Sequence, residues 1–167
     1  MSAVEDRLLA LGRPLPEVVA PLAAYVPATR SGSLVFTAGQ LPLVRGELHA
    51  AGLVSADADD SVVDGWVIDA GLVDVETAKE CAALAALNAI AAIKTVTDLD
   101  NVVRVVKLTG YVAGVPGFAA HPLVVNGASE LIGAVWGADG SHARSAVGVA
   151  SLPLNAPVEI EMIVEIG

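Results

Sequence analysis

The sequence predicts an α+β domain whose helices lie on one face of a mixed sheet. Residues 78–95 and 118–136 are rich in apolar helix formers and long enough for helices. Runs of β-branched residues at 102–112, 144–152 and 158–166 predict strands, and Gly, Pro, Asn or Asp separates them from the helices. A chain of 167 residues with 54% hydrophobic residues can bury one core, and no linker divides it, so we expect a single domain.

The first part of the chain predicts a short helix and a hairpin. Residues 4–12 have apolar side chains at helical spacing and end in glycine, which predicts an N-terminal helical extension. Strand-like runs follow at 18–26 and 33–37. The residues between them, 27–32, include Pro, Thr, Ser and Gly and predict the turn of the hairpin.

An insert separates this hairpin from the first long helix. Residues 45–73 are rich in Gly, Ala and Asp, with a strand-like run at 66–68, and a connection this long is usually functional or mobile. Acidic residues from Asp74 onward favour the positive end of the helix that follows. That helix, 78–95, is apolar nearly all round, so we expect the sheet to cover one face and, in an oligomer, a neighbouring subunit to cover another.

The charge composition limits the partners. Lys and Arg number 9 against 19 Asp and Glu, so a net charge of −10 argues against nucleic acid and anionic membranes. The longest nearly apolar run, 81–93, is shorter than the roughly 20 residues that cross a bilayer. The N-terminus carries acids where a signal peptide is basic, which predicts a cytoplasmic protein. Because only 17% of residues are charged, we also expect surface buried in a homo-oligomer.

No local motif predicts a metal or a covalent nucleophile. Cys81 is the single cysteine, which excludes an internal disulfide and a cysteine-based zinc site. The three histidines, His49, His121 and His142, stand far apart in the sequence and lack metal-ligand spacing. The sequence contains no G-x-S-x-G elbow, phosphate-binding loop or G-x-G-x-x-G motif. We therefore expect no metal site.

The last strand has two different faces. Its even-numbered residues from 158 to 166 are apolar and predict the core side, whereas Glu159, Glu161 and Glu165 point the other way. A row of carboxylates is the ordinary solvated side of an amphipathic strand, and it is also a source of general acids and bases. Both interpretations remain open for these three residues.

Arg144 begins the preceding predicted strand and is one of few basic residues. Ala146 and Gly148 share its face, so there is room beside the guanidinium for a ligand. A guanidinium presents paired donors that match a carboxylate, which favours binding of a carboxylate ligand. The alternative is a structural salt bridge between Arg144 and a glutamate of the last strand. In a simple hairpin of the last two strands, Arg144 would lie opposite Glu165 rather than Glu159.

The last two predicted strands contain HARSAVGVASLP at 142–153 and VEIE at 158–161. These segments resemble the closing signature of the RidA/YjgF family of reactive imine deaminases. FTAGQLP at 36–42 is similar to the family's Gly-Gln-Pro element after the first hairpin. The N-terminal segment and the insert look like the longer branch of the family. The resemblance covers roughly residues 16–44 and 74–167.

The resemblance implies a chorismate-mutase-like fold, with a mixed sheet and two main helices on one face. It also implies a homotrimer with three pockets at the subunit interfaces. Characterised members hydrolyse 2-imino acids or their enamine tautomers to 2-oxo acids and ammonia without a cofactor. The expected partners are therefore a small carboxylate-bearing ligand and further copies of this chain.

Site residues carry over one by one from the resemblance. Arg144 would bind the substrate carboxylate, and Glu159 would position or activate the attacking water. Tyr25 and Asn126 would line the pocket, and the backbone at Gly39 would form part of its wall. An imine is already electrophilic, so a site needs mainly to orient it and deliver water, for which no metal or nucleophile is required.

Two positions depart from the family pattern. Ala38 stands where the family commonly has Ser or Thr, and Ala146 where it often has Cys. Both changes enlarge the pocket and suit a bulkier or more apolar ligand. The alternatives are a non-catalytic trimer that binds small carboxylates as a sensor or regulator, and a deaminase or hydrolase of a larger unsaturated amino acid. Glu161 or Glu165 could also serve the water in place of Glu159.

Overall fold

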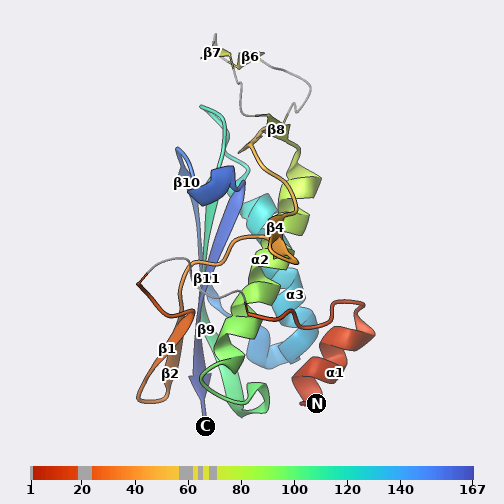
Figure 1. Ribbon diagram of the computed structural model, residues 1–167, viewed down its shortest axis with the longest axis vertical. Coiled ribbons are helices and arrows are strands. Elements are labelled where there is room, and N and C mark those ends of the chain that lie inside the picture. Colours follow the sequence, from red (N-terminus) through yellow and green to blue (C-terminus); the bar gives the residue numbers. More distant parts are fainter. Residues whose placement is uncertain (1, 19–23, 57–61, 64–65, 68–70) are drawn as a thin grey trace.

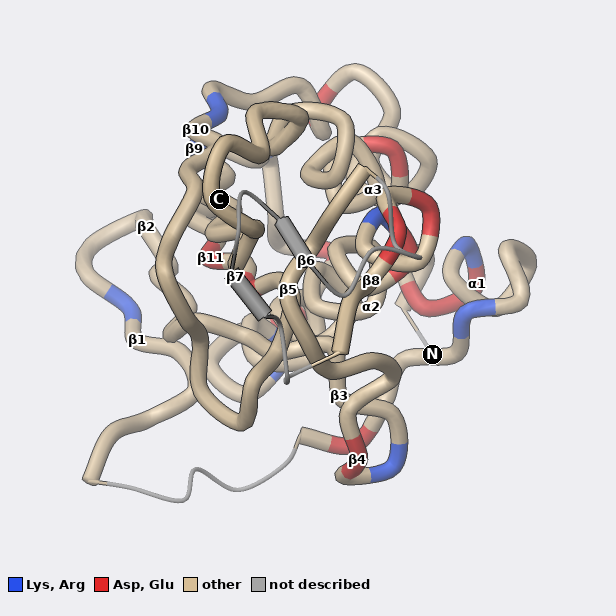
Figure 2. The backbone as a smooth tube through the Cα atoms, turned by 90° about the horizontal axis from the view of Figure 1, so that it is seen from above, with Lys and Arg blue, Asp and Glu red and all other residues tan. Residues whose placement is uncertain are grey.

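A five-stranded mixed sheet carries two long helices on one face. The computed structural model describes residues 2–18, 24–56, 62–63, 66–67 and 71–167. The strand order is β1-β2-β11-β9-β10, and all neighbours are antiparallel except β9 and β10. These strands are β1 (Ala28–Ser31), β2 (Leu34–Thr37), β11 (Val158–Ile166), β9 (Val102–Ala113) and β10 (Ala143–Val149). Helices α2 (Val75–Lys94) and α3 (His121–Trp136) lie on the same side of it, which confirms the predicted fold class (Figures 1 and 2).

The core lies between the sheet and the helices. Along β11 every second residue is buried, from Val158 to Ile166, and the three glutamates between them are half-exposed on the other face. Leu108 of β9 and Ile160 of β11 have no exposed surface. The predicted two-faced strand is therefore confirmed.

Helix α2 begins at a capped terminus and is buried on several sides. The Asp74 carboxylate accepts a hydrogen bond from the Thr77 backbone N–H at 2.8 Å, as an N-cap does. Asn88 donates to the carbonyls of Leu41 (2.8 Å) and Leu43 (3.0 Å), which holds the segment after β2 against the helix. Together with α3, this segment covers α2 within a single chain. From the sequence we expected a neighbouring subunit to cover a second face of this helix. Part of that surface is instead covered by α3 and the segment after β2 of the same chain.

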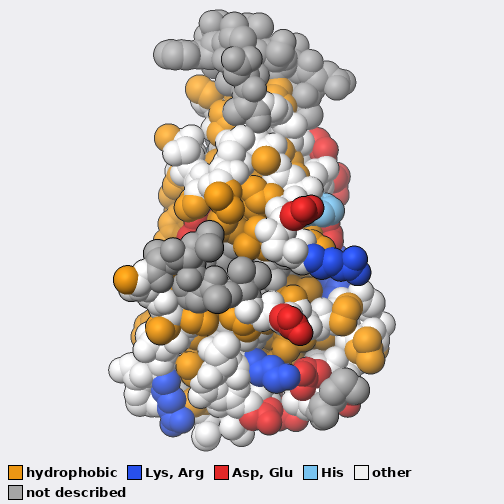
Figure 3. Space-filling view, viewed as in Figure 1, with side chains coloured by type: hydrophobic (Ala, Val, Ile, Leu, Met, Phe, Trp, Pro, Cys, Tyr) orange, Lys and Arg blue, Asp and Glu red, His pale blue; other side chains and the backbone are white. Residues whose placement is uncertain are grey.

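Helix α1 (Ala3–Ala10) confirms the predicted N-terminal helix. Ser2 and Glu5 form a reciprocal capping box at its start. The backbone N–H groups of Ala3 and Val4 donate to the Asp100 carboxylate, at 2.9 and 3.1 Å, which fastens the helix beside the start of β9. Among the side chains that Figure 3 colours by type, hydrophobic and neutral ones cover most of the face, and charged ones gather mainly in its lower part, in keeping with the low charge content.

The prediction for the first hairpin strand was wrong. Residues 18 and 24–26 are not strand, and residues 19–23 lie outside the described part of the chain. The first strand is β1, in the segment predicted as a turn, and β1 and β2 pair around a two-residue turn at Gly32 and Ser33. Because β1 is an edge strand with three exposed polar residues, it lacks the apolar alternation of a half-buried strand. Gly32 provides the positive φ (61°) that a tight hairpin turn needs.

Short strand pairs lie in the insert and directly before it. They are β3 (Leu43–Val44) with β4 (Glu47–Leu48), β5 (Leu53–Val54) with β8 (Leu72–Val73), and β6 (Val62–Val63) with β7 (Trp66–Val67). The predicted strand at 66–68 coincides with β7, and Ile68 is not among the described residues. The parallel pair β5–β8 brings residues 53–54 beside the last residues of the insert, 72–73, directly before the start of α2.

The last two strands are not neighbours. β9 lies between β10 and β11, so the simple hairpin considered for them is wrong. β10 also ends at Val149, three residues before the predicted end, because the chain turns through a 3-10 segment (Pro153–Asn155) in which Leu154 and Asn155 have positive φ. Helix α3 starts three residues later than predicted, with Pro122 in its first turn. No helix of the described residues has the length and hydropathy needed to cross a membrane.

Candidate functional site

Arg144 lies on the helix-facing side of the edge strand β10. In the sheet it is level with Leu108 of β9, which in turn pairs with Met162 of β11, and both of these face the helices. Its Nη1 donates to Oδ1 of Asn126 at 2.8 Å and to Oγ of Ser129 at 3.2 Å, and its Nη2 donates weakly to the Pro122 carbonyl at 3.4 Å. All three acceptors belong to α3, so this helix holds the guanidinium at three points.

The acceptors around Arg144 are neutral. Among the described residues no carboxylate pairs with it, so the structural ion pair considered for Arg144 is absent from this part of the chain. Asn126 and Ser129 take both hydrogens of Nη1, which leaves the parallel N–H bonds of Nε and Nη2 along one edge without a side-chain partner in the described structure. That edge matches a carboxylate in a bidentate arrangement.

Close packing places Asn126 beside Arg144. Gly110 of β9 lies under Val125 of α3, and a Cβ at this glycine would lie 2.8 Å from Val125 Cγ1. Because glycine permits this close approach, the helix sits low on the sheet and the next residue, Asn126, reaches β10. Asn126 is thus brought together with Arg144, as the resemblance implied.

Glu159 lies on the opposite, open face of the sheet. Its carboxylate is half-buried against Gly39 and fills the space that a side chain at position 39 would take. It has no hydrogen-bond or ion-pair partner among the described residues. Burial, and then the charge of Glu161, raise the pKa of this carboxyl.

The other two glutamates of β11 have partners. Glu161 accepts a hydrogen bond from the Tyr111 hydroxyl at 3.1 Å, and Glu165 pairs with Nε of Arg104 at 2.6 Å. Glu159 is therefore the uncommitted carboxylate of this row, with the raised pKa expected of a proton carrier.

One chain does not bring Arg144 and Glu159 together. Arg144 and Met162 lie on the helix side of the sheet, and Glu159, three positions before Met162 on β11, faces away from the helices. Ala146 follows Arg144 on the helix side and is packed against the core. The predicted site residues thus fall into two groups, one on each face.

The remaining predicted site residues lie in the segments before β1 and after β2, and of these Gly39 lies against the Glu159 carboxylate. Ala38 and Gly39 directly follow β2, and the Ala38 N–H donates to the carbonyl of Pro27 at 2.9 Å. This bond ties the segment that precedes β1 to Gly39, and Tyr25 stands at the surface of that segment with 55% of its area exposed. The structure does not bring Tyr25 into a hydrogen bond with another predicted site residue in the described chain.

Two residues near Arg144 had no role in the sequence-based prediction. Ser129 Oγ lies 3.0 Å from Nε2 of His142, and Nδ1 of His142 lies 2.6 Å from the carbonyl of Gly140. His142 comes two residues before Arg144 in the sequence, and that proximity was the available signal. Ser129 is three residues after Asn126, one helical turn along the same face of α3, a relationship that becomes informative once Asn126 is placed.

The described residues contain no other arrangement typical of a metal or thiol site. No group of three His, Cys, Asp or Glu side chains among them could hold a metal ion. Burial raises the pKa of Cys81 to about 12, so this thiol stays protonated at neutral pH.

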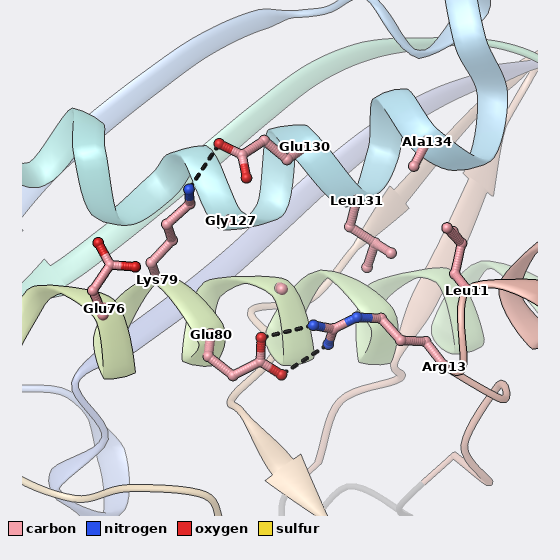
Figure 4. Close-up of a pocket in the computed structure, with 10 residues that line it drawn as sticks. Leu11, Arg13, Glu76, Lys79, Glu80, Gly127, Glu130, Leu131 and Ala134 are labelled. Atoms are coloured by element: carbon pink, nitrogen blue, oxygen red, sulfur yellow. Dashed lines mark hydrogen bonds and ion pairs between the residues drawn. The ribbon is translucent and has the colours of Figure 1, made fainter.

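A separate cavity of about 370 Å³ lies between α2 and α3 (Figure 4). Two ion pairs border it, Arg13 with Glu80 at 2.7 Å and Lys79 with Glu130 at 2.9 Å. Its lining contains none of the predicted site residues. Since Arg13 and Lys79, the two cations of its lining, are already paired, it offers no free cation to an anionic ligand.

The chain is similar to known proteins over nearly its whole length. A family model described as "YjgF/chorismate_mutase-like, putative endoribonuclease" matches residues 5–166. Protein TCP17 of Trypanosoma cruzi is 37% identical over 98% of this chain and 94% of its own length. The chain belongs to the YjgF/chorismate-mutase-like family, which confirms the resemblance described above.

Solved structures agree with this fold. The protein Atu1372 of Agrobacterium tumefaciens, described as having unknown function, is 45% identical with a TM-score of 0.81, covering 98% of this chain and 92% of its own. A "putative endoribonuclease" from Shewanella oneidensis MR-1 is 30% identical with a TM-score of 0.85, covering 99% of this chain and all of its own.

Proposed function

We propose that the protein hydrolyses reactive 2-imino acids, or their enamine tautomers, to 2-oxo acids and ammonia. The observation that carries this proposal is the guanidinium of Arg144, which α3 holds through neutral acceptors and whose Nε and Nη2 edge has no side-chain partner among the described residues. A carboxylate bound on that edge receives two charge-assisted hydrogen bonds, worth roughly 1.5–3 kcal/mol each. Arg144 thereby fixes the acid end of the substrate.

Glu159 supplies the proton transfer in this proposal. Its carboxylate takes a proton from water as the water oxygen bonds to the imine carbon and the C=N electron pair moves to nitrogen, and Glu159 then returns this proton to that nitrogen. In the resulting carbinolamine Glu159 carries the hydroxyl proton to the amino group, which leaves as ammonia as the C–N bond breaks and the C=O bond forms. No oxidant or cofactor is consumed. Burial and the charge of Glu161 raise the pKa of Glu159 above the usual glutamate value, which makes its carboxylate a better proton acceptor than an exposed glutamate.

Because Arg144 and Glu159 lie on opposite faces of the sheet, this mechanism needs two subunits. We propose a homotrimer in which Arg144, Asn126 and Ala146 of one subunit meet Glu159 and Gly39 of the next. The open face of the sheet, half-buried in the single chain, would then be covered by neighbouring copies.

Subunit mixing tests both the activity and the shared site. The protein should accelerate the decay of 2-iminobutanoate generated in solution, and Arg144→Ala and Glu159→Gln should each abolish most of that effect. Co-expression of the two variants should restore about a quarter of the wild-type activity, because random assembly leaves that share of interfaces with both native residues. Unchanged imine decay with the wild type would refute deamination, whereas mixed trimers without activity would refute the shared site.

A second function is supported by the same geometry. The Arg144 anion site is complete within one chain, without Glu159, so a trimer that only binds small carboxylates is the alternative. Binding of 2-oxobutanoate that Arg144→Ala abolishes, with no imine turnover by the wild type, would establish it.

The ribonuclease activity in the family description fits this chain less well. RNA is a polyanion, and a protein with net charge −10 repels it at long range. A single guanidinium serves a small carboxylate better than an extended phosphate backbone.

A further inference from the structure

A chain of hydrogen bonds runs from the Gly140 carbonyl through His142 and Ser129 to Arg144. The Gly140 carbonyl can only accept, so Nδ1 of His142, 2.6 Å away, carries the hydrogen of that bond. In the neutral ring Nε2 then has a lone pair, and the Ser129 hydroxyl, 3.0 Å away, donates to it. The direction of both hydrogen bonds is thus set by which of these atoms can donate and which can only accept.

This direction determines what Arg144 meets. With its hydrogen on the His142 side, Ser129 presents oxygen lone pairs to Nη1 of Arg144 at 3.2 Å. Asn126 Oδ1 accepts from the same nitrogen at 2.8 Å, so both hydrogens of Nη1 are committed. The guanidinium plane is thereby fixed, and its Nε and Nη2 edge has no side-chain partner among the described residues, apart from the weak bond of Nη2 to the Pro122 carbonyl at 3.4 Å.

We propose that His142 is a positioning residue that, through Ser129, holds Arg144 in its carboxylate-binding orientation. This rests on the proposed function, since it assumes that Arg144 binds the substrate carboxylate. His142 itself hydrogen-bonds Gly140 and Ser129 and touches no reacting atom in this scheme. The predicted effect is therefore on carboxylate affinity and KM, with kcat changed much less.

The carbonyl of Gly140 gives this chain a rigid starting point. Gly140 ends a 3-10 segment (Gly137–Gly140) and is buried, and a Cβ there would lie 2.7 Å from the Ile132 carbonyl oxygen of α3. The carbonyl, the histidine and the serine thus form one preorganised support, and preorganisation lowers the cost of ordering an arginine when ligand binds.

The experiment is a double-mutant cycle with 2-oxobutanoate as the probe, because it carries the carboxylate and does not turn over. His142→Ala and Ser129→Ala should each weaken its binding about 3- to 10-fold, the loss expected for one supporting hydrogen bond. The double variant should bind about as weakly as either single one, because both changes break the same chain. His142→Gln should recover most of the affinity, since its amide oxygen can accept from Ser129.

Controls separate this proposal from the function on which it rests. His49→Ala changes an exposed histidine outside this network and should leave binding unchanged. If Arg144→Ala binds like the wild type, both the anion site and the positioning role are overturned. If Arg144→Ala abolishes binding while His142→Ala binds normally, or if the two single effects simply add, only the positioning role is overturned. A lower kcat with unchanged KM in His142→Ala would also contradict it.

Discussion

The Glu159 carboxylate occupies the space that a side chain at position 39 would fill. A Cβ built on Gly39 would overlap Oε1 of Glu159 and lie 2.6 Å from its Cδ. The absence of a side chain at Gly39 is therefore what allows the carboxylate its half-buried place beside the end of β2. Gly39 and Glu159, more than a hundred residues apart in the sequence, are one structural unit in this protein.

Gly39→Ala should displace Glu159 without unfolding the protein. The group in the way is the end of a flexible side chain, which can rotate, so the free energy of unfolding should change by less than about 1 kcal/mol. Imine hydrolysis should fall about 10- to 100-fold, because a misplaced proton carrier loses its alignment with water. Steady-state kinetics and urea denaturation on the same sample measure both effects. Normal activity with normal stability would show that the position of Glu159 does not matter to the reaction.

Glu159→Gln should lower turnover far more than Glu165→Gln. Glutamine keeps the shape but cannot take a proton, and loss of a general base costs typically about 10²- to 10⁴-fold in rate. Glu165 is engaged by Arg104, so its substitution should remove only an exposed ion pair of small energetic value. Measuring kcat for the two variants tests this. A larger loss of kcat in Glu165→Gln than in Glu159→Gln would show that Glu165, not Glu159, is the general base.

The pH profile should carry the signature of the raised Glu159 pKa. Only the ionised carboxylate can act as base, so kcat/KM should fall as the pH decreases through a pKa above the usual glutamate value of about 4.3. Glu161→Gln removes the neighbouring negative charge that helps to raise this pKa, and its amide oxygen can still accept from Tyr111. The acid limb should therefore shift to lower pH in this variant. An unmoved limb would show that another group controls it.

The fold was predictable from sequence wherever burial is one-sided or helices are strongly apolar. The alternation of Val158 to Ile166 defined both faces of β11, and Asp74 marked the start of α2. The strand β1 was missed because polar residues on an exposed sheet edge follow no apolar pattern. The strand that pairs with β10 could not be predicted from local sequence pattern either. Whether β10 lies beside β11 or beside β9 depends on the path of the connecting segments across the sheet.

The candidate site was predictable as a set of residues but not as a geometry. Arg144 and Glu159 could be named from the family signature, whereas their separation onto opposite faces depends on strand register across β9. The resemblance assigned Asn126 to the pocket lining, and the structure has it hydrogen-bonded to Arg144. The support by Ser129 and His142 depends on α3 running alongside β10, which no local motif encodes.

Two glycines of α3 should respond in opposite ways to the same substitution. At Gly127 a Cβ would overlap the carbonyl oxygen of Lys79 in α2 and lie 2.8 Å from its carbon, and backbone atoms cannot rotate away. Gly127→Ala should therefore separate the helices and lower the free energy of unfolding by about 3 kcal/mol. A Cβ at the exposed Gly133 would meet no atom within 4 Å, so Gly133→Ala should raise the stability by about 0.5–1 kcal/mol through its helix propensity. Denaturation of both variants at one protein concentration measures the contrast, and equal effects at the two positions would show that α2 and α3 do not pack as closely as the structure has them.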